Sequence, residues 1–135
     1  MADPNIFSAY DLRGAVPQQW DENDAYNLGR AFGAFFKKRG AHTCYLGRDN
    51  RLTSPWIAKK VSRGLQESGV EVVNLGVVIT PMIYFSWHHF KAPATVMVTA
   101  SHNPPEYNGL KASLNQKPIF EKDLAKVKEI FLEKK

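Results

Sequence analysis

Short apolar runs alternate with amphipathic helical segments along this chain, and that alternation most constrains its fold. Four runs are short, rich in apolar residues and bounded by glycine, proline or polar residues, which is typical of strands. The expected strands cover residues 43–47, 70–75, 94–98 and 109–114. Helical spacing and end signals predict helices over 21–39, 54–69, 82–90 and about 121–134. This order predicts an α/β protein, a three-layer α/β/α sandwich with a mixed, mostly parallel sheet.

Residues that favour helix ends support these bounds. Asp21 begins an acidic first turn, and Gly40 stops the first helical pattern. Ser54 is expected to cap the second helix, with Pro55 at its first position. Trp56, Trp87 and the phenylalanines are expected to fill the core rather than to bind a cofactor.

Length and composition favour one soluble domain. A chain of 135 residues with 44 % hydrophobic residues can bury a substantial core. No apolar run approaches the roughly 20 residues that span a bilayer, and residues 1–5 do not resemble a signal peptide. We therefore expect no membrane partner. Cys44 is the only cysteine, so we expect no internal disulfide and a cytoplasmic location.

The net charge of +5 raises the question of a nucleic-acid partner. The positive residues are dispersed along the chain, and no known nucleic-acid-binding signature is present. We therefore expect no nucleic-acid partner, but a solvated basic surface that is compatible with phosphorylated, anionic ligands.

A serine follows the strand expected over 94–98. This segment, called the serine loop below, is Thr99-Ala100-Ser101-His102-Asn103-Pro104-Pro105, and its two prolines stiffen the turn. A small side chain held at a strand end among polar groups suits a nucleophile or a phosphate carrier, although an ordinary polar loop has the same composition. His102 is a poor base for Ser101 if the backbone is extended, because neighbouring side chains then point to opposite faces.

Four motifs resemble, in order and spacing, those of the α-D-phosphohexomutases, the phosphoglucomutase/phosphomannomutase family. They are Phe7-Ser8-Ala9-Tyr10-Asp11-Leu12-Arg13-Gly14; Leu46-Gly47-Arg48-Asp49-Asn50-Arg51 with Ser54; Gly76 with Thr80-Pro81; and the serine loop with Tyr107-Asn108-Gly109 and Lys111. Leu12 stands where isoleucine is more usual. The resemblance implies that residues 1–135 form domain I of this family, the domain that bears the phosphoserine, and that the remaining family domains are outside this chain.

The resemblance also implies an activity. Ser101 would carry a phosphoryl group that moves between the 1- and 6-positions of a phosphorylated hexose, through a bound bisphosphate sugar. A hexose 1,6-bisphosphate would act as activator. The residues around Ser101 fit the glucose/mannose branch of the family better than the glucosamine branch.

The same resemblance assigns roles to residues near Ser101. Lys111 would be the general acid/base, brought close by a tight turn at Asn108-Gly109. Arg13 would grip phosphate with its two-pronged guanidinium. His102 is expected, from its position next to Ser101 and not from the resemblance, to orient the loop or to hydrogen-bond the substrate. The residues expected to bind phosphate or substrate are Tyr10, Arg13, Asn103 and Lys111.

Several acidic and basic residues have a structural alternative. Asp11 and Asp49 could pair with Arg13, Arg48 or Arg51 to hold loops in place. Arg48 and Arg51 are expected mainly to organise buried loops, with a lesser chance of contact with phosphate.

Magnesium is implied by the resemblance, with Ser101 as a ligand through its phosphate. A hard cation needs several oxygen ligands, and the family's Asp-rich loop is not present in this sequence. The chain is therefore interpreted as one domain of a longer mutase that is inactive alone. The alternative is a free-standing module that binds phosphate or a phosphosugar without turnover. A serine hydrolase is disfavoured because the sequence has no Gly-x-Ser-x-Gly elbow.

Overall fold

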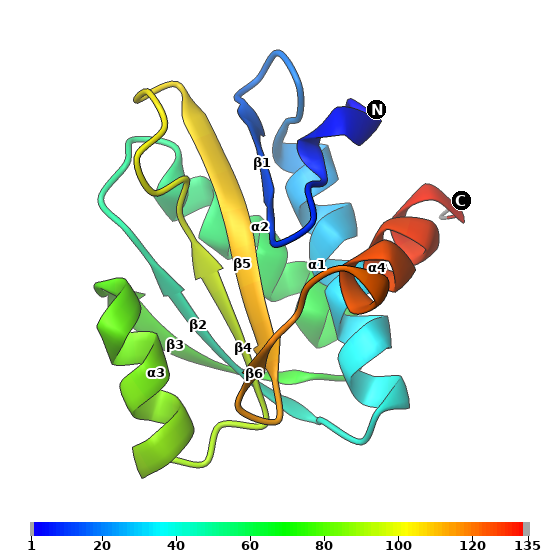
Figure 1. The fold of residues 1–135 in the computed structure, drawn as a ribbon, viewed down its shortest axis with the longest axis vertical. Helices are drawn as coiled ribbons and strands as arrows, with labels where there is room; N and C mark the ends of the chain where they lie inside the picture. The colour runs from blue at the N-terminus through cyan, green and yellow to red at the C-terminus, as the bar shows by residue number, and fades with distance from the viewer. Residues whose placement is uncertain (1, 134–135) are drawn as a thin grey trace.

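The computed structural model describes residues 2–133, which contain a mixed six-stranded sheet and four α-helices (Figure 1). The strands are β1 (Leu12–Ala15), β2 (Thr43–Arg48), β3 (Glu71–Val77), β4 (Ala94–Val98), β5 (Tyr107–Leu114) and β6 (Lys117–Pro118). The helices are the 3₁₀ turn η1 (Pro4–Ile6), α1 (Glu22–Lys38), α2 (Ser54–Glu67), α3 (Thr80–His89) and α4 (Lys122–Glu133).

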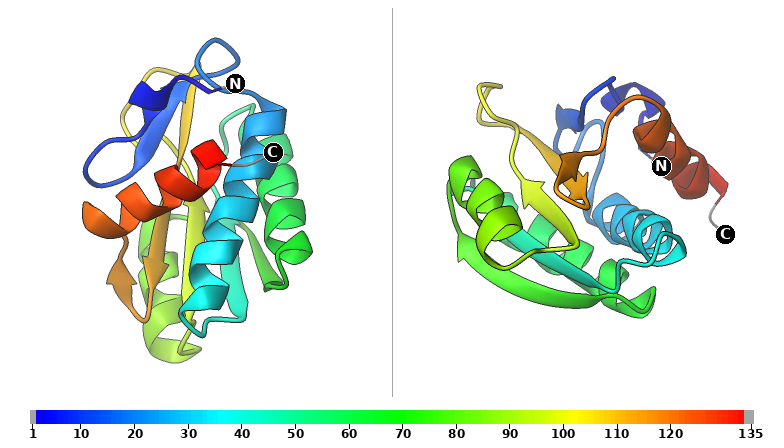
Figure 2. Two further views of the ribbon diagram at one scale, coloured as in Figure 1. Left: turned by 90° about the vertical axis from the view of Figure 1, so that its right-hand side faces the viewer. Right: turned by 60° about the horizontal axis from the view of Figure 1, so that its bottom comes forward.

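The expected α/β/α sandwich with a mixed sheet is confirmed, but its named strands form two parallel and three antiparallel pairings, so the sheet is less parallel than expected. The strand order is β1-β5-β4-β2-β3, with β6 beside β5. Strands β4, β2 and β3 are parallel, while β5 pairs antiparallel with β4, β1 and β6. Helices α1, α2 and α4 cover one face of the sheet, and α3 lies on the other (Figures 1 and 2).

Two glycines allow α1 and α2 to pack closely. A Cβ atom at Gly29 would lie 2.3 Å from the carbonyl oxygen of Val61, and one at Gly64 would lie 2.2 Å from that of Tyr26. Both distances are far below van der Waals contact, and both neighbours are backbone atoms that cannot turn aside. The interface between the two helices therefore requires glycine at both positions.

Gly64→Ala is expected to lower the free energy of unfolding by about 2 kcal/mol, because the added methyl group forces the helix backbones apart. Urea unfolding followed by circular dichroism measures the change. Gln66→Ala, at an exposed position of the same helix, is the control and should stay within about 0.5 kcal/mol of the parent chain. Equal stability of the two variants would contradict this account of the interface.

The sequence placed most element ends within two residues. Helix α1 has Asp21 as its N-cap, in a reciprocal capping box with Asp24. The expected Ser54 cap is wrong, since Thr53 precedes the helix and neither cap bond nor extended cap geometry is found there. The Ser54 hydroxyl is used elsewhere, as described below. Helix α3 begins at Thr80 rather than at residue 82.

The tight turn expected at Asn108-Gly109 is also wrong. Both residues lie inside β5, which pairs with β1, a strand that the sequence patterns did not predict. A Cβ atom at Gly109 would lie 2.1 Å from the carbonyl oxygen of Leu12, so glycine is required by the close approach of β1. The chain instead turns between β4 and β5, in the serine loop.

The expectation that the phenylalanines lie in the core holds only on the α1/α2/α4 side of the sheet. Phe32, Phe35, Phe36 and Phe131 are fully buried there. Phe85 and Phe90, in and just after α3, are about half exposed, at 55 % and 50 %. Helix α3 covers only a small apolar cluster, which consists of Val78, Ile83, Trp87 and Met97.

Among the helices formed by residues 2–133, none combines the length and the apolar character needed to cross a membrane.

Candidate functional site

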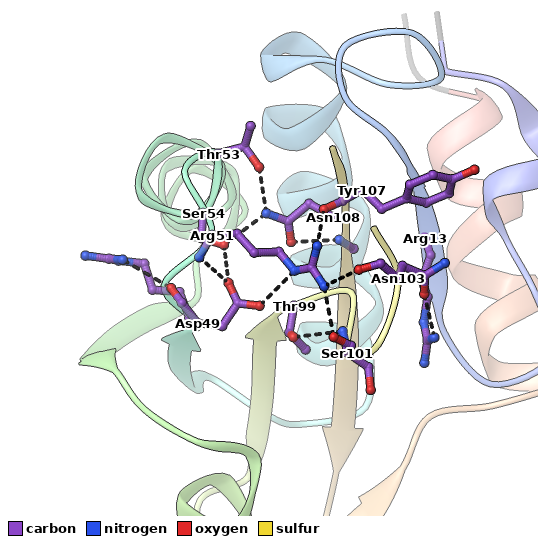
Figure 3. A network of polar contacts seen from close by, with 12 residues as sticks. Arg13, Asp49, Arg51, Thr53, Ser54, Thr99, Ser101, Asn103, Tyr107 and Asn108 are labelled. Carbon is purple, nitrogen blue, oxygen red and sulfur yellow. Dashed lines mark hydrogen bonds and ion pairs between the residues drawn. The ribbon is translucent and has the colours of Figure 1, made fainter. Parts of the chain in front are cut away.

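The serine loop leaves β4 at Val98 and places Ser101 in an unusual backbone conformation. Ser101 has a φ of 55°, in the left-handed region that non-glycine residues seldom adopt. Its amide donates a hydrogen bond to Thr99 Oγ1 at 3.1 Å (Figure 3). The amide of Asn103 donates to the Ala100 carbonyl, also at 3.1 Å. The side chain of Ser101 is exposed. A strained backbone that presents an exposed hydroxyl is a feature of functional sites.

This conformation also removes the geometric reason that made His102 a poor base for Ser101. Residues 101–103 form a turn and not extended backbone, so the alternation of side chains does not apply to Ser101 and His102. The side chain of His102 is exposed beside Ser101 in the chain.

Arg51, in the loop after β2, holds the serine loop through hydrogen bonds from its guanidinium group. Its Nη1 donates hydrogen bonds to the carbonyl oxygens of Pro104 and Tyr107, at 2.7 and 3.1 Å. Its Nη2 donates to the carbonyl oxygens of Ser101 and Asn103, both at 2.9 Å (Figure 3). The expectation that Arg51 organises a loop is thereby confirmed: one guanidinium satisfies four carbonyl groups of the loop.

Asp49 in turn holds Arg51. Its Oδ2 lies 3.3 Å from Arg51 Nε, and its Oδ1 accepts from the Arg51 amide at 3.0 Å and from the Ser54 hydroxyl at 2.5 Å. The pairing role expected for Asp49 is confirmed. Arg48, the other expected loop organiser, donates from Nη1 to the Asp49 carbonyl at 3.2 Å.

The network continues to β5 through Asn108, which is fully buried. The Asn108 amide nitrogen donates to Thr53 Oγ1 at 2.8 Å and to Ser54 Oγ at 2.9 Å (Figure 3). Its Oδ1 accepts from the amide of Gly109 at 2.9 Å. The loop after β2, the start of α2 and the start of β5 are thus joined under the serine loop.

Ser101 lines an open cavity of about 550 Å³. Thr80 and Pro81, the first two residues of α3, line the same cavity. Asp49, Arg51 and Asn103 also line this cavity. The volume is within the range of small-molecule sites.

A second cavity of about 560 Å³ holds four of the expected site residues: Tyr10, Arg13, Asn103 and Lys111. It also contains Asp11, which is only 7 % exposed. Arg13 donates from Nε and Nη2 to Asp11 Oδ2 at 3.0 and 2.8 Å, and Lys111 Nζ lies 3.8 Å from the same oxygen. The pairing with an arginine that was expected for Asp11 is therefore observed, and its partner is Arg13.

Asn103 connects the two cavities, because it lines both of them. Its Oδ1 accepts a hydrogen bond from Arg13 Nη1 at 2.9 Å (Figure 3). The structure therefore brings Tyr10, Arg13, Asn103 and Lys111 together and places Ser101 in the adjoining cavity. Lys111 reaches this position by pairing opposite Met97 in the β4–β5 hairpin.

The fit of this site to magnesium is poor. The described part of the chain, residues 2–133, contains no group of three or more His, Cys, Asp or Glu side chains that could hold a metal ion. Asp49 is the carboxylate that shares a cavity with Ser101, and both of its oxygens are already engaged by Arg51 and Ser54.

Comparison with known proteins decides the family. Residues 4–135 match the family described as phosphoglucomutase/phosphomannomutase, alpha/beta/alpha domain I. The chain belongs to the phosphoglucomutase/phosphomannomutase family. It represents the α/β/α domain I of that family, as the four sequence motifs indicated.

Named relatives agree with this assignment. The chain is 44 % identical over 110 residues to a phosphoglucomutase of Neisseria gonorrhoeae, covering 82 % of this chain and 24 % of the relative. It is 41 % identical over 107 residues to a phosphomannomutase/phosphoglucomutase of Pseudomonas aeruginosa, covering 79 % and 23 %. The chain therefore spans about a quarter of the length of these curated relatives.

A solved structure of a phosphoglucomutase/phosphomannomutase family protein from Burkholderia thailandensis has the same fold. It superposes with a TM-score of 0.92 at 33 % sequence identity, over 98 % of this chain and 31 % of that one.

Three features of this family domain escaped the sequence reasoning: the strand β1, the buried role of Asn108, and the use of Thr53 and Ser54 as its partners. Asn-Gly is a strong turn signal, so a turn was expected at Asn108-Gly109, and the strand was expected to begin only at Gly109. The position of the pair between two prolines and an apolar run was the available sign that the turn comes earlier.

Proposed function

We propose that this chain is the domain of a hexose-phosphate mutase whose Ser101 carries the phosphoryl group. The observation that carries the proposal is the exposed Ser101 in a left-handed turn, whose carbonyl is fixed by Arg51. A backbone held in this way restricts where the hydroxyl oxygen can lie, which favours the alignment that in-line phosphoryl transfer requires.

The reaction has two balanced transfers. A hydroxyl oxygen of the hexose phosphate attacks the phosphorus of phosphorylated Ser101, the bond from phosphorus to Ser101 Oγ breaks, and the hydroxyl proton passes to a base. The resulting bisphosphate sugar turns round. Ser101 Oγ then attacks the other phosphate, the sugar oxygen leaves, and it takes back a proton. Serine is phosphorylated again at the end.

Residues of the second cavity supply the positive charge that stabilises the transferring phosphate and the group that moves the proton. Arg13 is held by Asp11 through Nε and Nη2, and by Asn103 through Nη1, which fixes the guanidinium at the junction of the two cavities. Lys111 is the proposed acid/base, and Tyr10, stacked on Phe120 with ring centroids 6.1 Å apart, borders the same cavity. His102 is proposed to bind the substrate from the serine loop.

The remaining parts of the reaction are assigned to the rest of a longer polypeptide. We propose that its other domains bind the far end of the phosphorylated hexose and provide carboxylates for Mg²⁺, with phosphorylated Ser101 as a further ligand. The proposed activator is a hexose 1,6-bisphosphate. The single cysteine, Cys44, is buried and fits a reducing location such as the cytoplasm.

Ser101 is expected to become phosphorylated when a polypeptide that joins this chain to the other family domains is incubated with glucose 1,6-bisphosphate. Mass spectrometry of the proteolytic peptides should find phosphate on Ser101. Ser101→Ala should abolish the modification, whereas Ser113→Ala, on β5 away from the loop, should leave it intact. Stable phosphate on another residue, with Ser101 unmodified, would refute the assignment.

A further inference from the structure

A third cavity lies outside the serine site, between α2 and the strands β2 and β3. It has a volume of about 520 Å³. Its polar lining residues include Arg48, Lys59, Lys60, Arg63, Gln66 and Asn74, and we call it the α2–β3 basic groove. All of its lining residues lie in the described part of the chain, and none of them is acidic. It shares no lining residue with the cavity of Ser101.

The four cations of the groove are incompletely neutralised. Arg63 pairs with Glu67 at 2.9 Å, and Lys60 Nζ is 4.0 Å from Glu22. Within residues 2–133, neither Arg48 nor Lys59 has a carboxylate partner. The groove therefore retains positive charge from its own side chains.

The spacing of the cations along α2 is unfavourable for the helix alone. Lys59 and Arg63 are four residues apart, so their like charges lie on the same side of the helix and repel each other. Neither residue lies in the last turn, where cations would complement the helix dipole. An anion bound between them would relieve this repulsion.

Asn74 on β3 adds a neutral donor. Its Oδ1 accepts a hydrogen bond from the amide of Gly76 at 2.8 Å, which fixes the side chain in a local turn. The side-chain nitrogen of Asn74, Nδ2, has no partner among residues 2–133. Donors from β2, α2 and β3 thus line a single groove, which is the arrangement that an anion with several oxygens requires.

We propose that the α2–β3 basic groove binds the phosphate group of a small phosphorylated ligand. Arg48 and Arg63 offer planar groups that match two phosphate oxygens, and Lys59 contributes a point charge. The cations are gathered in one cavity of small-molecule size rather than spread along a surface, which favours a small ligand over a nucleic acid.

The test is a titration of the ¹⁵N-labelled 135-residue chain with inorganic pyrophosphate at low salt, followed by amide chemical shifts. Saturable shifts are expected at Arg48, at residues 58–66 and at Asn74. Lys59→Glu should weaken binding by about tenfold or more, since it removes a hydrogen bond between charged groups and adds a repulsive charge. Lys59→Arg should keep most of the affinity.

Lys126→Glu is the matched control, because it makes the same charge change at an exposed site on α4. Its affinity should stay within about twofold of the parent, as expected for a distant charge that salt screens. Each variant's own spectrum reports whether it is folded. Ser101→Ala should leave the shifts in the groove unchanged.

In the pyrophosphate titration, three results would overturn the proposal: no saturable shift in the groove, shifts confined to the serine loop, or equal weakening by Lys59→Glu and Lys126→Glu. A single-stranded RNA oligonucleotide is titrated in parallel. Tighter binding of that RNA to the groove than of pyrophosphate would assign the groove to nucleic acid instead.

Discussion

Lys111→Met, in a polypeptide that joins this chain to the other family domains, is expected to slow phosphoryl transfer by about 10²–10⁴-fold. Methionine is similar in length to the lysine stem but cannot accept or donate a proton. Lys111 lies on β5 with its side chain 39 % exposed, so the variant should fold. A single-turnover experiment that follows phosphate from Ser101 to the sugar isolates the chemical step.

The control for this variant is Lys126→Met, which removes an exposed lysine from α4 and should leave the rate unchanged. The rate of each protein is measured across the pH range, because loss of an acid/base removes one limb of the profile. If Lys111→Met keeps nearly normal rates at every pH, then the proton is handled by His102 or by a residue outside this chain.

The elements with strong local signals were predicted correctly from the sequence. Helix α1 is an example: Asp21 at its start, Gly40 after its end and helical apolar spacing all agree. The buried strand β4 has an equally clear pattern of apolar residues on both faces. Signals of this kind depend on a few neighbouring residues, which is why a sequence alone reveals them.

The errors came from contacts between distant segments. Strand β1 is four residues long and owes its pairing to β5, about 95 positions later in the chain. Asn108-Gly109 resembles a turn locally, but Asn108 is buried by its bonds to Thr53 and Ser54. Ser54 favours helix caps, yet its hydroxyl bonds to Asp49 instead. Local preferences of about 1 kcal/mol were overridden by buried polar contacts of similar or greater strength.

The candidate site shows the same division. The motifs predicted Ser101, Arg13 and Lys111 as site residues, and the structure places Arg13 and Lys111 around one carboxylate, Asp11. The number of loop carbonyls that Arg51 holds is not a property of any motif, because the four carbonyls become neighbours only when the serine loop is folded. That arrangement leads to a strong expectation about stability.

Arg51→Ala is expected to lower the free energy of unfolding by about 3 kcal/mol. The substitution removes four hydrogen bonds to loop carbonyls and the guanidinium beside Asp49. Breaking a buried ion pair costs about 3–5 kcal/mol, and the lower end applies because the two side chains remain 13 % and 21 % exposed. Urea unfolding followed by circular dichroism measures the loss.

The loop itself provides the sharper readout. Arg51→Ala removes the four carbonyl bonds that help to hold Ser101 in its left-handed backbone conformation, so amide signals of residues 99–107 should shift or broaden. Arg51→Lys should restore less than half of the lost stability, because one ammonium group cannot reach all four carbonyl oxygens that the two Nη atoms of arginine contact. Arg30→Ala, at an exposed position on α1, is the control and should change stability by no more than about 0.5 kcal/mol. If Arg51→Ala matched that control in stability and kept the loop signals in place, the serine loop would hold its shape without Arg51, and the fixed position proposed for Ser101 would need another cause.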